Sequence, residues 1–221
     1  MLPCSLDPGL RGKVLLGGIV LEGVVVRPRD EALQAEMAAL AADLKGRYAA
    51  VPSGDIPGVS EARGLYKALG LDPTKTRPSN EALLRRALKG EVLRSINSLV
   101  DALNLCSLRH QLPFGLYDLD RVKPPIVLRL GAPGESYEGI GKGAVHVGGR
   151  PVLADEEGAF GNPSSDSFRT RVTLETRRAL ATVYAPGSWS RPKVEKVLSD
   201  ASATLRRHSQ GTEGGLFLVG G

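Results

Sequence analysis

Two segments in the second half of the sequence carry residue types that could perform hydrolytic chemistry. GAFGN, from Gly158 to Asn162, contains two glycines whose backbone N–H groups could stabilise a negative charge developing on a carbonyl oxygen. SSDSFRTRVT then places Asp166, Arg169 and Thr170 within a few residues. The alternative for these polar residues is structural, because Asp166 can cap a turn and Arg169 can pair with it at the surface.

Several familiar kinds of active site are excluded by the sequence. Cys, His and carboxylate residues never cluster at the spacing of metal ligands, so we expect neither a metal nor another cofactor. Only two cysteines are present, Cys4 and Cys106, which is too few for a disulfide framework. The nucleophile motif Gly-x-Ser-x-Gly is absent. A glycine-rich run at 139–143 lacks the Lys-Ser/Thr pair that ends a phosphate-binding loop.

The chain is basic, with 29 Lys and Arg against 24 Asp and Glu, a net charge of +5 and a pI of about 9.4. A basic surface favours RNA, because phosphate contacts supply affinity that does not depend on sequence. The candidate RNA-binding residues are Arg85, Arg86 and Lys89 in one expected helix, and Arg177 and Arg178 farther on. Paired arginines can equally form a solvated helix face.

Length and composition indicate one folded domain over residues 1–221. Apolar residues make up 42% of the chain, which is enough for a core, but aromatic residues make up only 5%. The core must therefore consist mostly of Leu, Val and Ala. No secretory signal is visible, and no apolar run reaches the roughly 18 residues of a membrane helix. We expect a soluble, cytoplasmic protein.

Helices and strands must position the candidate residues. Apolar spacing and end signals predict helices at about 31–47, 60–69, 79–90, 92–108 and 190–208. Strand character is expected at 14–26, and short strands separated by glycine follow residue 116, at about 116–119, 126–130, 145–147, 151–155, 176–184 and 215–219. We predict an α+β fold in which helices pack on a mixed or antiparallel β-sheet sandwich, with helices mostly first and sheet mostly second.

One run of sequence carries a more specific pattern. In residues 93–122, LRSINSLVDALNLCSLRHQLPFGLYDLDRV, a helix with IN-x-x-VD-x-x-N leads through a proline turn to D-L-D; the matching residues are Ile96, Asn97, Val100, Asp101, Asn104, Pro113, Asp118, Leu119 and Asp120. Then IVLRLGAPGE fits I-x-x-R-x-A-x-x-GE, and PVLADEEGAFG and LETRRAL follow in order. Together these pieces, over roughly residues 75–186, resemble the B3/B4 (editing) module of the phenylalanyl-tRNA synthetase β subunit.

The resemblance implies a compact B3/B4-like fold with a pocket that hydrolyses the ester of a wrongly attached amino acid on a tRNA. The family's pocket asparagine falls on Asn104, its pocket histidine on Gly115, and its glutamate close to Thr182. We expect Asn104, the backbone of Gly158 and Gly161, and Asp166 to be catalytic. The expected substrate-binding residues are Phe114, Gly115, Asn162, Arg169, Thr170 and Thr176.

Three functions stay open. The first is hydrolysis of aminoacyl-tRNA in trans by a stand-alone B3/B4 domain. The second is binding of RNA or an amino-acid-like ligand without catalysis, because Gly115 and Thr182 replace polar side chains of the family. The third is a protein–protein module. The first two require the helix with Asn104, the turn after Pro113 and the glycine-bearing segment to meet at one cleft.

Overall fold

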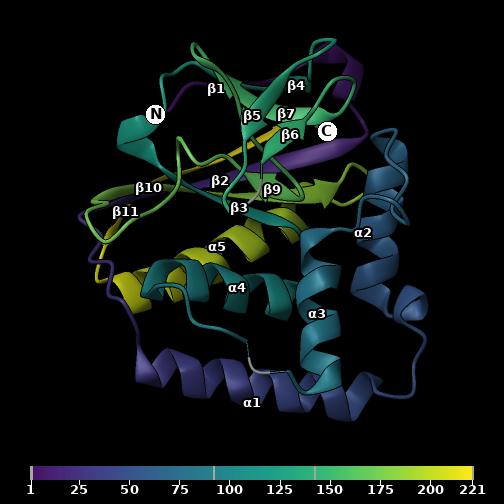
Figure 1. Ribbon diagram of the computed structural model, residues 1–221, viewed down its shortest axis with the longest axis vertical. Coiled ribbons are helices and arrows are strands. Elements are labelled where there is room, and N and C mark those ends of the chain that lie inside the picture. The colour runs from purple at the N-terminus through teal and green to yellow at the C-terminus, as the bar shows by residue number, and fades with distance from the viewer. Residues whose placement is uncertain (1, 92, 142, 221) are drawn as a thin grey trace.

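A computed structural model describes residues 2–91, 93–141 and 143–220 (Figure 1). Two stacked β-sheets form the upper half, and helices cover the lower sheet (Figure 1). The lower sheet is antiparallel, in the order β11(Thr212–Gly220), β2(Val14–Glu22), β10(Arg178–Pro186), β3(Phe114–Asp118). The upper sheet has the order β1(Cys4–Leu6), β4(Ile126–Leu130), β7(Pro151–Asp155), β8(Gly158–Asn162), β9(Ser165–Asp166). Only its β1–β4 pair is parallel.

The described residues also form five α-helices and a small separate hairpin. The helices are α1(Glu31–Tyr48), α2(Pro57–Ala68), α3(Ser79–Lys89), α4(Ser98–His110) and α5(Arg191–Ser209), and the hairpin joins β5(Ser136–Glu138) to β6(Ala144–His146). α4 and α5 lie directly under the lower sheet, and α1 lies beneath them (Figure 1). The predicted α+β sandwich with packed helices is confirmed. The chain does not run from helices to sheet, however, because the N-terminal β2 pairs with both β10 and β11.

Most predicted elements are present, with shifted ends. Gly90 ends α3 at a φ of 72°, the left-handed conformation in which glycine commonly terminates helices. α4 begins at Ser98 rather than near Val92, and Val92 itself lies outside the described residues. The reason is Asn97, whose side chain accepts a hydrogen bond from the Val100 N–H at 2.9 Å and so caps the helix there.

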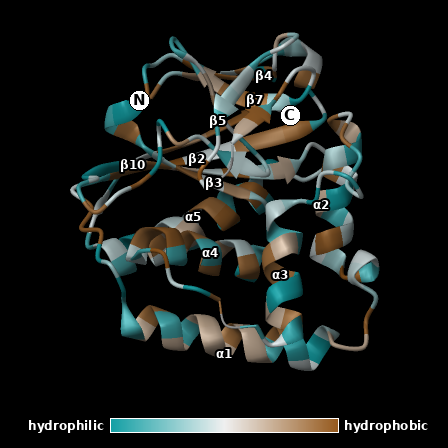
Figure 2. Cartoon of the chain, viewed as in Figure 1, coloured by the Kyte–Doolittle hydropathy of each residue, from teal (hydrophilic) through white to brown (hydrophobic). Residues whose placement is uncertain are grey.

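Alternation along the strands divides the core into two layers. Phe114 and Leu116 of β3 pack with residues of α4 and α5 beneath the lower sheet. Tyr117 points to the other face and packs between the two sheets with Leu180 and Tyr184 of β10. Figure 2 shows hydrophobic residues concentrated in the sheets and the helices next to them. Alternate residues of β3 therefore face the helices on one side and the second sheet on the other.

The described part of the chain contains neither a membrane-spanning helix nor a metal-binding cluster. None of its helices combines the length and apolar character that crossing a membrane requires. It also contains no group of three or more His, Cys, Asp or Glu side chains placed to hold a metal ion.

Candidate functional site

A cleft of about 580 Å³ lies where α3, α4 and the turn between β8 and β9 meet. Its apolar lining residues are Ala82, Leu83, Ile96, Val100, Leu103 and Phe114. Its uncharged polar lining residues are Thr76, Ser79, Asn104, Ser107, Ser164 and Ser165. Two of the three segments expected to meet, the helix with Asn104 and the chain after Pro113, thus share one cleft.

The charged part of the lining is entirely basic: Lys75, Arg77, Arg86 and Arg150. None of the described lining residues is Asp, Glu or His. Lys75, Arg86 and Arg150 form no ion pair with a described residue, and Arg77 makes only a 3.6 Å contact with Glu81. The cleft is therefore a site of concentrated positive charge, suited to an anionic ligand.

The polar residues of the α4 motif divide into two structural residues and one that lines the cleft. Asn97 caps the helix, and the buried carboxylate of Asp101 accepts three hydrogen bonds. Its donors are the Ser95 hydroxyl (2.6 Å), the Ile96 N–H (3.0 Å) and the Gln34 side-chain amide (2.8 Å). The Asn104 carboxamide, in contrast, forms no hydrogen bond with the described residues. It keeps its full capacity to bond a ligand.

The turn between β8 and β9 is held in shape by Asn162. The Asn162 side-chain oxygen accepts hydrogen bonds from the N–H groups of Ser164 (2.8 Å) and Ser165 (2.9 Å). Its amide donates to the Tyr137 hydroxyl (2.8 Å), which donates to the Ser165 carbonyl (2.6 Å). Tyr66 adds a 2.7 Å hydroxyl contact to Ser164. Burial raises the pKa of Tyr66 and Tyr137 above their usual range, so both hydroxyls stay protonated. Asn162 shapes the cleft without lining it.

Gly115 and Thr182 face each other across the β3–β10 pair, between the two sheets and outside the cleft. The Tyr117 hydroxyl occupies the space that a Cβ atom on Gly115 would need, and the Thr182 hydroxyl oxygen lies 3.0 Å from the same point. Burial, followed by the negative charge of Asp166, raises the pKa of Tyr117 and Tyr184 well above the usual range. A closed cluster of hydroxyl groups thus fills this region.

The glycine-bearing segment is a strand and not a loop. Residues 158–162 form β8, which pairs with β7 on one side and, at Gly161 and Asn162, with β9 on the other. Gly158 lies at the β7–β8 turn with a φ of 116°. Gly161 packs against the buried Tyr117 hydroxyl. Neither glycine lines the cleft, which the next turn, at Ser164 and Ser165, lines instead.

Asp166 and Arg169 do not pair with each other. The Asp166 carboxylate accepts a hydrogen bond from the Leu116 N–H at 3.3 Å, which ties β9 to β3. Arg169 forms two hydrogen bonds with Asp155, at 3.0 and 2.9 Å, and an ion pair with Glu157 at 3.1 Å. Because its partners lie at the β7–β8 turn, Arg169 points away from the cleft. The alternative of a surface pair with Asp166 was wrong, since the partner is the buried side chain of Asp155.

The two predicted threonines are buried structural residues. The Thr170 hydroxyl lies 2.9 Å from that of Ser167. The Thr176 hydroxyl donates to Asp118 at 2.7 Å, which fixes the segment before β10 against the end of β3. Neither residue lines the cleft.

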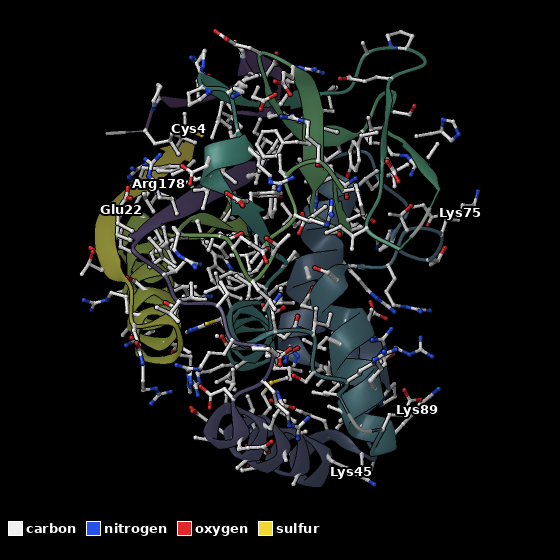
Figure 3. All side chains as sticks on the ribbon, turned by 60° about the vertical axis from the view of Figure 1, so that its left-hand side comes forward. Cys4, Glu22, Lys45, Lys75, Lys89 and Arg178 are labelled. Carbon is white, nitrogen blue, oxygen red and sulfur yellow. The ribbon has the colours of Figure 1, made fainter. Side chains whose placement is uncertain are left out.

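The basic residues proposed for RNA binding lie on different faces. Arg86 lines the cleft, whereas Arg85 does not. Arg178 pairs with Glu22 at 2.8 Å and with Asp120 at 3.0 Å, and Arg177 donates to the carbonyls of Leu174 and Thr176. Figure 3 shows Arg178 beside Glu22 on the opposite edge of the molecule from Lys75 and Lys89.

The sequence did not predict the cleft residues Lys75, Arg77, Arg150, Ser164 and Ser165. They lie on the connections before α3, before β7 and after β8, except for Ser165, which begins β9. Isolated basic and hydroxyl residues on connections carry no periodic pattern, so only the fold brings them together. The one available signal was the Asn-Pro-Ser-Ser turn itself, whose residue types favour a side chain–backbone turn.

Comparison with known families agrees with the motif on α4. The B3/4 domain matches residues 61–210, which include α3, α4 and every strand of the cleft region. The chain belongs to the B3/4 domain family. The resemblance drawn from residues 75–186 is thereby confirmed at the level of the family.

One solved structure extends the comparison. An N-terminal fragment of the phenylalanyl-tRNA synthetase beta-subunit from Pyrococcus horikoshii is similar at 17% sequence identity and a TM-score of 0.47. The alignment covers 98% of this B3/4 chain and 50% of that one, so this chain spans half the length of the fragment. No curated protein matches the sequence.

Proposed function

We propose that the cleft binds the aminoacylated end of a tRNA and that this B3/4 domain hydrolyses the ester bond in trans. The observation that carries the proposal is the Asn104 carboxamide, which lines a basic cleft and has no hydrogen-bond partner among the described residues. A polar group left unpaired beside apolar walls is a typical feature of a ligand site.

The lining fits the parts of such a substrate. Lys75, Arg77, Arg86 and Arg150 supply charge for the terminal phosphates. The apolar wall includes Phe114 and Ile96, whose side chain is 63% exposed, and it can receive a base or an amino acid side chain. The hydroxyl and amide groups can bond the ribose and the ester. An amino-acid-like ligand and an RNA end are thus both accommodated.

The proposed reaction requires no cofactor. The oxygen of a water molecule bonds to the ester carbonyl carbon, the bond from that carbon to the ribose oxygen breaks, and the ribose oxygen takes up a proton. We assign Asn104 as a hydrogen-bond donor to the carbonyl oxygen as negative charge develops on it. Removing one such donor lowers the rate by about 10² to 10³-fold. Because the described lining contains no carboxylate or imidazole, positioning and charge stabilisation carry the reaction.

The second candidate is binding without hydrolysis. The same lack of a general base in the described lining favours it, since a base contributes about 10² to 10⁴-fold to a hydrolytic rate. The closed hydroxyl cluster at Gly115 and Thr182 also favours it, because those positions offer no side chain to the cleft.

Incubation with a panel of labelled aminoacyl-tRNAs separates the two candidates. Release of the amino acid faster than in buffer for at least one member supports hydrolysis. Tight binding of the panel with release at the buffer rate supports the second candidate. Neither binding nor release would reject both.

We also propose that residues 1–221 form a single domain. The pairing of β2, near the start, with β11, at the end, supports this, because it leaves no boundary at which the chain could be divided.

A further inference from the structure

The face of α3 that lines the cleft continues beyond it. Ser79, Ala82, Leu83 and Arg86 line the cleft, and they follow the helical spacing of three and four residues. The next position in this series is Lys89, one turn farther along α3. Arg85 does not line the cleft, but it lies four residues before Lys89 and therefore on the same side of α3 as Lys89.

This row of basic residues runs along one edge of the molecule. Figure 3 shows Lys75, Lys89 and Lys45 on the same edge, from the level of the sheets down to α1. The Lys45 Nζ atom comes within 3.0 Å of the point where a Cβ on Gly90 would stand, so it lies beside the C-terminal end of α3. Since α3 has 11 residues, the row extends along about 16 Å of helix.

The cations of the row are weakly engaged by protein carboxylates. Lys75, Arg86 and Lys45 form no ion pair with a described residue. Lys89 lies 3.6 Å from Glu91, and both side chains are exposed, which makes the pair weak.

The acidic residue of α3, Glu81, does not line the cleft. Glu81 is fully buried, and its carboxylate receives two hydrogen bonds from Arg63, at 2.7 and 2.8 Å. Its contact with Arg77 is longer, at 3.6 Å. On the opposite edge, in contrast, Arg178 is held by two carboxylates.

We propose that Lys75, Arg86, Lys89 and Lys45 bind the sugar–phosphate backbone of a double-helical RNA stem whose single-stranded 3′ end enters the cleft. This inference rests on the proposed function, since the stem is the part of the same tRNA substrate that lies outside the cleft. A duplex backbone presents phosphates at regular intervals, which matches cations spaced along a helix.

A double helix fits this row better than a single strand does. Proteins that hold single strands stack the bases on aromatic side chains. Phe114 is the one aromatic residue of the described cleft lining, and α3 itself contains none. Stacking of a base is thus available inside the cleft, and along α3 beyond it only contacts to phosphates are.

Fluorescence anisotropy of the full chain with three probes tests the surface. The probes are an RNA hairpin with a short single-stranded 3′ tail, the tail alone, and a DNA hairpin of the same sequence. Lys89→Gln should weaken binding of the RNA hairpin and make the plot of log Kd against log salt less steep by about one unit. Binding of the tail alone should not change, because Lys89 lies outside the cleft lining.

Arg206→Gln is the matched control, since it removes the same charge from an exposed arginine on a different helix, α5. It should leave both Kd and the salt dependence unchanged. Equal losses for Lys89→Gln and Arg206→Gln would overturn the proposal in favour of general attraction by net charge. Equal affinity for the DNA hairpin would also overturn the assignment to RNA.

The outcomes separate this surface from the proposed hydrolysis. If Lys89→Gln binds the hairpin like the wild type while the wild type still hydrolyses aminoacyl-tRNA, the proposed stem-binding surface is rejected and the proposed hydrolysis is retained. If Lys89→Gln binds the hairpin more weakly than the wild type and no aminoacyl-tRNA is hydrolysed, the stem-binding surface is retained and the proposed hydrolysis is rejected.

Discussion

The hydroxyl of Tyr117 lies over Gly115, two residues earlier on the same face of β3, in the space that a Cβ atom would need. Gly161 of β8 meets the same hydroxyl from the other sheet. Tyr117 is fully buried and makes an edge-to-face contact with Phe160, with ring centres 4.9 Å apart. Its ring therefore has no room to move, and the two glycines and the tyrosine form one packing unit.

Gly115→Ala should lower the free energy of unfolding by about 1–3 kcal/mol, because the added methyl group meets a side chain that cannot shift. The double variant with Tyr117→Phe should recover part of this loss, since the hydroxyl, which has no hydrogen bond with the described residues, is removed. Urea unfolding of both single variants and the double variant measures the coupling.

Gly64→Ala is the control for that cycle. Gly64 lies on α2 with nothing within 4 Å of an added Cβ, so the change should raise stability by up to about 1 kcal/mol. Strictly additive effects of Gly115→Ala and Tyr117→Phe would show that the hydroxyl does not fill the space beside Gly115.

The two asparagines of the α4 motif should separate stability from ligand binding. Asn97→Ala removes the cap of α4 and should lower the free energy of unfolding by about 1 kcal/mol. Asn104→Ala removes no hydrogen bond to a described residue and should leave the melting temperature nearly unchanged. A large loss of stability for Asn104→Ala, measured by thermal unfolding, would show that Asn104 is a structural residue.

Glu135 should make stability depend on acidity. Its hydrogen bonds with Arg129, both 2.8 Å, together with the N–H of Ala132, lower its pKa from 4.5 to about 2. A carboxylate with a lowered pKa stabilises the folded state above its unfolded-state pKa, and this contribution is lost as the pH falls from 4.5 towards 2.

Glu135→Gln should therefore cost about 2 kcal/mol at pH 7 and much less near pH 2, measured by urea unfolding at both pH values. Glu91→Gln, which breaks an exposed pair, should have little effect at either pH. A difference between Glu135→Gln and the wild type that stays constant from pH 7 to pH 2 would contradict the assignment.

Asn162 should control the shape of the cleft through the turn it holds. Asn162→Ala leaves the N–H groups of Ser164 and Ser165 without their acceptor and should lower stability by about 1–3 kcal/mol. Asn162→Asp keeps that acceptor and should retain more affinity for tRNA than Asn162→Ala does. Equal affinities, measured by anisotropy, would show that the turn does not shape the binding site.

Local signals in the sequence predicted most of the fold. Asp30 and Gly90 mark the start of α1 and the end of α3 as expected, because caps act within one turn of the chain. The start of α4 was predicted too early, because the apolar residues before Asn97 continue the helical spacing. The true start is set by a single side chain, that of Asn97, which caps the helix. The role of β2 could not be predicted, since its partners β10 and β11 lie more than 150 residues away.

The candidate site was harder to predict because its residues are joined only by the fold. Asn104 and Arg86 were found through a motif and a helix, and both line the cleft. Gly158 and Gly161 were expected to offer backbone N–H groups to the site, but the pairing of β8 with β7 and β9 makes their segment a strand of the sheet outside the cleft. No local pattern in the sequence indicates that Arg150 lines the cleft.

Single-turnover hydrolysis of aminoacyl-tRNA by the wild type, Asn104→Ala and Asn97→Ala tests the role of the cleft most directly. We expect release faster than in buffer for the wild type, a loss of about 10² to 10³-fold for Asn104→Ala, and a nearly wild-type rate for folded Asn97→Ala. Equal rates for the wild type and Asn104→Ala, whether fast or at the buffer level, would contradict the assignment of the cleft as the hydrolytic site.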